Sequence, residues 1–115
     1  MRTITYVERL KGPMRVGEDF NYIVDVVIPK NLLDGRKFDF DPREFRVSFD
    51  IDDPHSRSQS KGLTQPPIYQ NEVEDLYRLN FMAKTFTPGR RTISFDYYYN
   101  NSIVATDEAS MEFVR

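Results

Sequence analysis

The sequence predicts an all-β protein in which two antiparallel sheets of about seven strands in total pack face to face. Apolar and polar residues alternate over several short stretches, and no window shows a helical period. Glycine, proline, asparagine and aspartate separate these stretches. With 115 residues, the chain is long enough for one two-layer core and too short for two. We therefore expect a single domain over residues 1–115.

Some of the expected strands are better defined than others. The clearest alternation predicts strands at Phe20–Ile28, Phe45–Ile51, Tyr77–Ala83 and Thr92–Tyr99. Shorter or less regular strands are expected at Thr3–Leu10, Met14–Val16, Ile68–Tyr69 and Ile103–Phe113. After Ala83 the inward parity is lost at Phe86, which predicts a slip in register through a bulge before that residue.

Two longer segments carry the composition of loops. Residues 30–43 contain Asp34-Gly35 and Asp41-Pro42, which favour turns. Residues 53–67 are rich in serine, are apolar at one position only, and lie between prolines. This second segment is predicted to be a mobile loop.

Composition excludes several classes of partner. Sixteen lysine and arginine residues stand against eighteen acids, which gives a formal charge of −2, and no basic block is longer than the Arg90-Arg91 pair. Nucleic acid is therefore not an expected partner, because binding phosphates requires a concentrated positive face. There is no cysteine for disulfides or thiolate metal sites. No apolar run approaches the length of a membrane-spanning helix, so membrane insertion is not expected.

The number and spacing of the expected strands are typical of an antiparallel immunoglobulin-like β-sandwich. The segments Val16–Phe20 and Thr87-Pro88-Gly89, each leading into a strand, resemble those of the immunoglobulin-like modules of filamin repeats, transglutaminase domains and bacterial multidomain surface proteins. The chain lacks the cysteine pair and the tryptophan of antibody-type domains, and Arg90-Arg91-Thr92 replaces the expected tyrosine. The resemblance implies a module for binding, spacing or assembly, and not an enzyme.

In this topology, alternate loops gather at the two ends of the sandwich. The first end is expected to collect charges of both signs, which we interpret as surface ion pairs such as Asp52 or Asp53 with Arg90. The alternative is a site for an acidic ligand. The residues expected there are Lys11, Arg15, Glu18, Asp52, Asp53, His55, Arg57, Lys61, Arg90 and Arg91.

The second end is expected to be acidic and rich in amides and tyrosine. The residues expected there are Asp34, Asp39, Asp41, Asn71, Glu72, Glu74, Asp75, Tyr99, Asn100, Asn101 and Ser102. Binding surfaces use tyrosine with asparagine and serine because a rigid ring gives contact area while small polar groups adapt. The candidate protein-binding residues are Asp39, Asp41, Tyr99, Asn100 and Asn101. The alternative is that Tyr97 and Tyr99 belong to the core and that Asn100-Asn101 is only a turn.

Catalytic and metal chemistry find little support in the sequence. His55 is the only histidine, and the five glycines are scattered at turns, so no catalytic triad or phosphate-binding loop can be assembled. No cofactor is expected. A calcium site would have to join Asp39 or Asp41 with Glu72, Glu74 or Asn100.

These observations predict a non-catalytic protein-binding or spacer module of a larger protein or assembly, which contacts its partners through the loops at the second end, those between the second and third, fourth and fifth, and sixth and seventh strands of the sandwich. The alternative is a calcium- or carbohydrate-binding module that uses the same loops. Because residues 111–115 still read as a strand, we interpret the chain as a domain of a longer protein. The outward residues Ile23, Val27 and Met82 could form an apolar patch for self-association.

Overall fold

The computed structural model describes residues 2–8, 12–30, 32–33, 36–37 and 40–115. Its elements confirm an all-β protein, with a single short 3₁₀ helix, η1 (Pro42–Glu44), in the described part of the chain. The strands are β1 (Arg2–Val7), β2 (Met14–Arg15), β3 (Phe20–Pro29), β4 (Leu32–Leu33), β5 (Arg36–Lys37), β6 (Phe45–Ile51), β7 (Gln59–Gly62), β8 (Tyr69–Gln70), β9 (Glu74–Ala83), β10 (Gly89–Tyr99) and β11 (Ser102–Val114).

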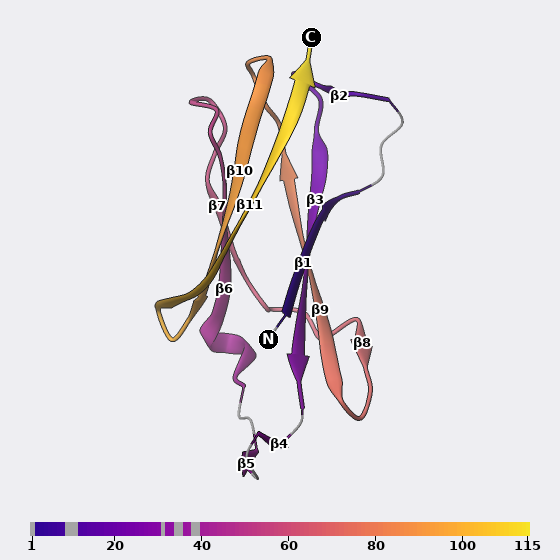
Figure 1. The fold of residues 1–115 in the computed structure, drawn as a ribbon, viewed down its shortest axis with the longest axis vertical. Helices are drawn as coiled ribbons and strands as arrows, with labels where there is room; N and C mark the ends of the chain where they lie inside the picture. Colours follow the sequence, from indigo (N-terminus) through magenta and orange to yellow (C-terminus); the bar gives the residue numbers. More distant parts are fainter. Residues whose placement is uncertain (1, 9–11, 31, 34–35, 38–39) are drawn as a thin grey trace.

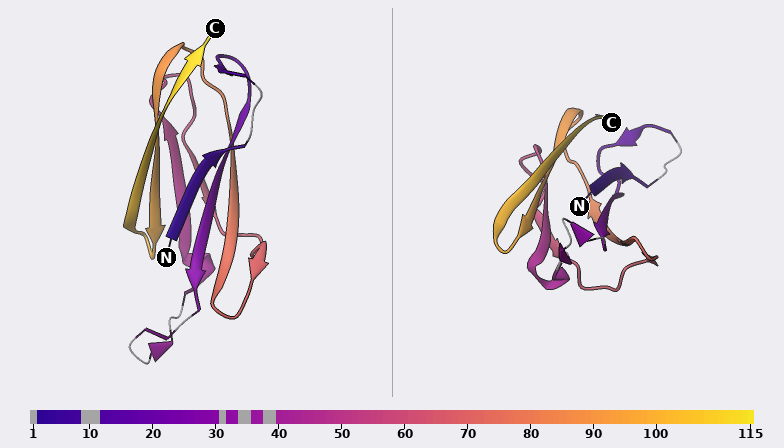
Figure 2. Two further views of the ribbon diagram at one scale, coloured as in Figure 1. Left: turned by 45° about the vertical axis from the view of Figure 1, so that its right-hand side comes forward. Right: turned by 60° about the horizontal axis from the view of Figure 1, so that its bottom comes forward.

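The strands form two main sheets that face each other (Figures 1 and 2). The four-stranded sheet has the order β1-β3-β9-β8, and all its pairs are antiparallel. The five-stranded sheet has the order β2-β11-β10-β6-β7, and it curls along its length. Because β2 runs parallel to β11, this second sheet is mixed and not purely antiparallel as predicted. Strands β4 and β5 form a small separate pair.

The core lies between the two sheets and follows from the alternation in the sequence. Inward residues of β3, β6, β9 and β10 are almost completely buried. Aromatic rings fill the centre, where Phe49 stacks on Phe81 at 5.1 Å and Tyr22 packs against Phe95 at 5.1 Å between ring centroids. Buried aromatic pairs of this kind contribute area and preferred geometry together. The four strands with the clearest alternation therefore hold the sandwich together.

The expectation of a mobile loop over residues 53–67 is wrong for its central part. Residues 59–62 form β7, which pairs with β6, and Leu63 is buried. The side chains of β7 and its approach bridge to the facing sheet: Gln59 donates to the Met82 carbonyl at 2.8 Å, Ser56 donates to the Lys84 carbonyl at 2.8 Å, and Lys61 donates to the Asn80 carbonyl. An edge strand bonded through polar side chains lacks the apolar pattern that would reveal it.

The expected register slip before Phe86 is also wrong. The inward parity continues from Ala83 to Thr85, which is fully buried, whereas Phe86 is 49% exposed. The observed irregularity lies in β11, where Tyr97 opposes Ala105 but Tyr98 opposes Ile103. This bulge leaves Val104 without an opposite residue on β10.

The predicted apolar patch is not formed as expected, because two of its three residues are covered. Ile23 and Val27 are only 8% and 3% exposed, and Met82 alone is open, at 57%. Strand β1 lies beside β3 and sets Tyr6 opposite Ile23. On the same face, buried Asp25 accepts two hydrogen bonds from the Arg78 guanidinium, at 2.8 and 3.1 Å, and one from the Tyr6 hydroxyl at 3.0 Å.

Candidate functional site

The tip of the β10–β11 hairpin is a tight turn. Tyr99 pairs with Ser102, and the two residues between them, Asn100 and Asn101, have positive φ angles of 50° and 65°. Two-residue hairpin turns of type I′ require positive φ at both central residues, and asparagine adopts this conformation more readily than most residues. The prediction of a turn at Asn100-Asn101 is therefore confirmed.

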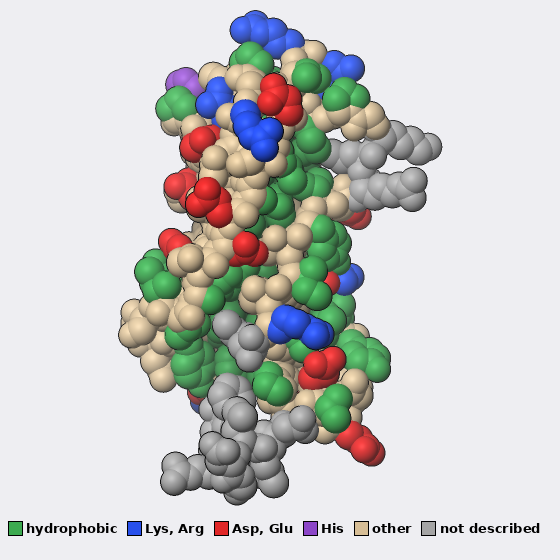
Figure 3. Space-filling view, viewed as in Figure 1, with side chains coloured by type: hydrophobic (Ala, Val, Ile, Leu, Met, Phe, Trp, Pro, Cys, Tyr) green, Lys and Arg blue, Asp and Glu red, His purple; other side chains and the backbone are tan. Residues whose placement is uncertain are grey.

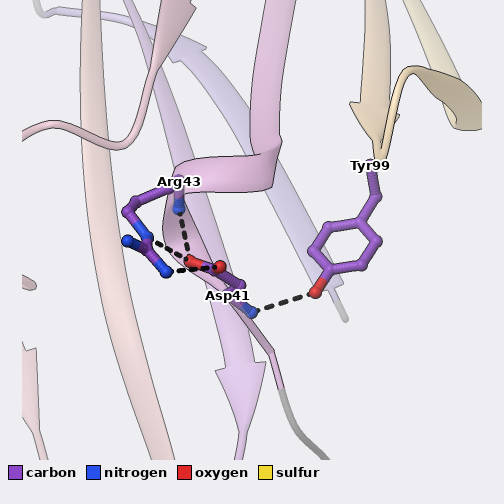
Figure 4. Close-up of polar contacts among 3 residues, drawn as sticks. All are labelled: Asp41, Arg43 and Tyr99. Carbon is purple, nitrogen blue, oxygen red and sulfur yellow. Dashed lines mark hydrogen bonds and ion pairs between the residues drawn. The ribbon is translucent and has the colours of Figure 1, made fainter.

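Contacts with η1 hold this tip in place (Figure 4). The Asp41 backbone N–H donates to the Tyr99 hydroxyl at 2.9 Å, and the Asn100 N–H donates to the Glu44 carbonyl at 3.1 Å. The Tyr99 ring also stacks on Phe40, with 5.2 Å between centroids. Tyr97 is fully buried, as the core interpretation predicted, whereas Tyr99 is half-buried and links the hairpin to η1.

The Asp41 carboxylate is already engaged by its own neighbourhood. Its Oδ1 accepts from the Arg43 backbone N–H at 3.0 Å and from Arg43 Nε at 3.1 Å, while Oδ2 accepts from Nη2 at 3.1 Å. These hydrogen bonds from the Arg43 side chain and backbone lower the pKa of Asp41. Asp41 caps the N-terminus of η1, where proline at the first position fixes the backbone. The carboxylate thus helps to fix the conformation of this loop.

The structure brings four of the five predicted binding residues together: Asp41, Tyr99, Asn100 and Asn101. Asp39 lies outside the described residues. The acidic turn before β9 is held by its own hydrogen bonds, because the Asn71 side chain accepts from the N–H groups of Val73 and Glu74. Within the described ranges, no three or more histidine, cysteine, aspartate or glutamate side chains are grouped so as to hold a metal ion. Asp41, Glu72 and Glu74 are therefore not grouped in this way.

A second group of residues near the tip was not predicted. Tyr98 and Arg46 are opposite each other on β10 and β6, and the guanidinium carbon lies 3.9 Å from the ring centroid. Ile103, opposite Tyr98, and Val104 at the bulge are 55% and 52% exposed. We call the set Arg46, Tyr98, Asn100, Asn101, Ile103 and Val104 the tip surface. The sequence did contain a signal for this exposed apolar surface. Ile103 and Val104 are consecutive apolar residues next to the inward Ala105, and in a strand at least one of two consecutive residues must face outward.

At the opposite end, the expected ion pair of Asp52 or Asp53 with Arg90 is not present among the described residues. Asp53 is 3% exposed and accepts four hydrogen bonds: from the His55 N–H at 2.9 Å, the Phe86 N–H at 2.8 Å, the Thr87 N–H at 3.1 Å and the Thr87 hydroxyl at 3.0 Å. Burial alone would raise the pKa of Asp53, but these bonds outweigh it and lower the pKa to about 2. This carboxylate therefore holds the β9–β10 turn to the end of β6.

Two hollows of about 420 and 480 Å³ lie on the side of the sandwich where β7 faces β9. His55, Lys84 and Phe86 are among the residues around the first, and Lys61 and Arg78 are among those around the second. Neither hollow includes a residue of the tip surface. The described residues include no helix long and apolar enough to cross a membrane.

A scan against protein-family models and a search of curated proteins both found no match for this chain.

Proposed function

We propose that this chain is a non-catalytic protein-binding or spacer module with an immunoglobulin-like sandwich, and that it contacts its partner through the tip surface. The strand order supports the architectural part of this proposal. Taken in sequence, β1, β3, β6, β8, β9, β10 and β11 match strands A to G, and they group as A-B-E-D and C-F-G. Strands β2 and β7 then extend the C-F-G sheet at its two edges.

The observation that carries the binding role is a rigid tip that exposes apolar and aromatic side chains. Ile103 and Val104 keep more than half of their surface exposed beside the Arg46–Tyr98 stack. Tyrosine and arginine are enriched among residues that dominate binding energy, and a surface fixed before binding loses less conformational entropy. The contacts of Tyr99 and Asn100 with η1 supply that fixation.

An affinity experiment with a matched control tests this role. The double variant Ile103→Ser with Val104→Ser removes the apolar part of the tip surface. Ile68→Ser with Val73→Ser changes the same residue types at nearly equal exposure, 56% and 51%, near the β8–β9 hairpin. Quantitative mass spectrometry of proteins captured from the source cells should show partners that wild type and control retain and the tip variant loses.

Retention of every partner by a folded tip variant would contradict the binding role of the tip surface. A wild-type chain that captures nothing would leave the spacer role alone. Circular dichroism and the unfolding midpoint of both double variants must match those of wild type, so that a loss of capture reports the changed surface.

A further inference from the structure

Strand β11 has a long edge that no strand of the described structure covers. It runs over 13 residues and pairs with β10 on one side. On the other side it pairs with β2 at Phe113 and Val114 only. Within the described residues, the edge from Ser102 to Glu112 therefore has no neighbouring strand, and Figure 1 shows β11 passing along the margin of the sandwich.

At every second residue of β11, the backbone N–H and C=O groups point outward from this open edge, away from β10. The Val16 N–H donates to the Val114 carbonyl at 2.8 Å, so that carbonyl faces away from β10. Alternation along a strand directs the N–H and C=O of Glu112, Ser110 and Glu108 to the same side. The Glu108 N–H agrees with this, because it donates to the Asp107 side chain at 2.8 Å.

The inner side of the same edge is apolar. Ala105, Ala109 and Met111 are partly buried and pack against the core, as does Val7 of β1. Figure 3 shows hydrophobic side chains along the middle of the molecule, in the region between β11 and β3. Asp107 is the polar exception on this side, and it accepts a long hydrogen bond of 3.5 Å from the Thr5 hydroxyl. An added strand would place every second side chain against this apolar surface.

Charge distinguishes between the possible occupants of the edge. Strand β11 carries Asp107, Glu108 and Glu112 and has no lysine or arginine. Edge-to-edge pairing of two copies would bring acids near acids, and like charges opposite each other destabilise a strand pair. A strand with lysine or arginine on its outward side would be attracted instead.

We propose that the open edge of β11 binds an extended segment of a partner protein by strand addition, and that apolar residues alternate with lysine or arginine in this segment. Its backbone pairs with the groups at Glu108, Ser110 and Glu112 and displaces the Asp107 side chain from the Glu108 N–H. Its apolar side chains cover Ala105, Ala109 and Met111, and its cations face Glu108 and Glu112. The site lies between Ala105 and Glu112, shares no residue with the tip surface, and does not require the tip to bind anything.

Three labelled peptides test the proposal on the intact chain by fluorescence anisotropy. The first is a seven-residue peptide of alternating lysine and valine, the second has glutamate for lysine, and the third has the sequence of the first with every backbone nitrogen methylated, so that no N–H remains for pairing in either strand direction. The first should bind with a Kd on the order of 100 µM, and the other two about tenfold more weakly. Equal binding of the first and third peptides would overturn the proposal, because it would show charge attraction without strand pairing.

Variants of β11 locate the site. Ser110→Pro removes an N–H that faces the open edge and is not needed for pairing with β10, so the fold should tolerate it. We expect it to weaken binding of the lysine peptide about tenfold. Glu108→Lys with Glu112→Lys should reverse the preference to the glutamate peptide, whereas the control Glu18→Lys with Glu72→Lys, at exposed acids elsewhere, should not.

Two outcomes would overturn the assignment. Wild-type binding by both the charge-reversed variant and a folded Ser110→Pro variant would exclude this edge. A dimer in sedimentation that Ser110→Pro abolishes would identify a second copy as the occupant. Loss of captured partners in the tip variant alone, with unchanged peptide binding, would concern the proposed function and not this site.

Discussion

Asp53 and Asp41 begin the same local turn at opposite ends of the sandwich. Each accepts the N–H of the residue two positions further on, His55 at 2.9 Å and Arg43 at 3.0 Å. Asp53 is buried, and its other oxygen binds Phe86 and Thr87, which are 33 and 34 residues away. Asp41 remains more exposed, and within the described ranges its carboxylate accepts hydrogen bonds from Arg43 alone. The same short-range motif thus fixes a distant chain segment at one end and only its own loop at the other.

The largest expected effect comes from Asp53→Ala. The change removes a buried acceptor and leaves the N–H groups of His55, Phe86 and Thr87 without their partner, and it should lower the free energy of unfolding by about 3 kcal/mol. Urea denaturation followed by fluorescence measures this. The matched variant Asp41→Ala should change the midpoint far less, because water reaches the groups that it frees. If both variants lost the same free energy of unfolding, the bonds from Asp53 to Phe86 and Thr87 would contribute nothing to stability.

Asp53 and Asp41 should also differ in how their contributions to stability depend on pH. The pKa of Asp53 is about 2 in the folded chain, against an ordinary value of 3.8 for an aspartate that water surrounds in the unfolded chain. Its contribution is therefore present above pH 3.8 and is lost as the pH falls toward 2, by about 2 kcal/mol. The pKa of Asp41 is lowered in the same direction, but salt screens an exposed pair.

Denaturant unfolding at about pH 5 and about pH 2.5, in low and high salt, checks this expectation. The fall in stability should be steeper in wild type than in Asp53→Asn, and the difference should persist in high salt. If the two proteins lose stability in parallel, the hydrogen bonds to Asp53 do not lower its pKa as described.

At the end of the sandwich that holds η1, we expect Tyr99→Phe to cause a smaller loss of stability. The variant keeps the ring that stacks on Phe40 but removes the acceptor of the Asp41 N–H, and it should cost about 1 kcal/mol. Tyr69→Phe is the control, since Tyr69 is 55% exposed and its hydroxyl, within the described part of the chain, accepts only a long hydrogen bond of 3.5 Å from the Asn71 side chain. Thermal unfolding compares the two. A control that costs as much as Tyr99→Phe would argue against a specific link between the hairpin and η1.

The strongest strands could be predicted from sequence because their burial alternates with period two. In β6 and β10, for example, Phe49 and Phe95 are fully buried while their neighbours face outward. Strand β7 could not be predicted in this way, since its side chains bond to carbonyls of β9 and need no apolar pattern. The helix η1 had a readable signal in Asp41-Pro42, where a capping residue precedes proline.

The candidate site was only partly predictable from the sequence, because some of its contacts depend on strand register. Asn100-Asn101 is a local signal, and the turn follows from it directly. The Arg46–Tyr98 stack depends on which residues of β6 and β10 lie opposite each other, and the exposure of Val104 depends on a bulge. Both are set by strand register, which sequence patterns place only to within a residue or two. The cover of Ile23 by Tyr6 likewise required knowing that β1 joins β3.

The two margins of the sandwich differ in how many hydrogen bonds join the two sheets. This difference predicts where the sheets first separate. Along β7, the side chains of Ser56, Gln59 and Lys61 donate to carbonyls of the facing sheet. Along β11, Phe113 packs against Phe20 of the facing sheet, but the only side-chain hydrogen bond from β11 to that sheet within the described residues is the long one between Thr5 and Asp107. The margin at β7 therefore resists separation of the sheets, and the margin at β11 is where thermal opening should begin and where water first reaches the core.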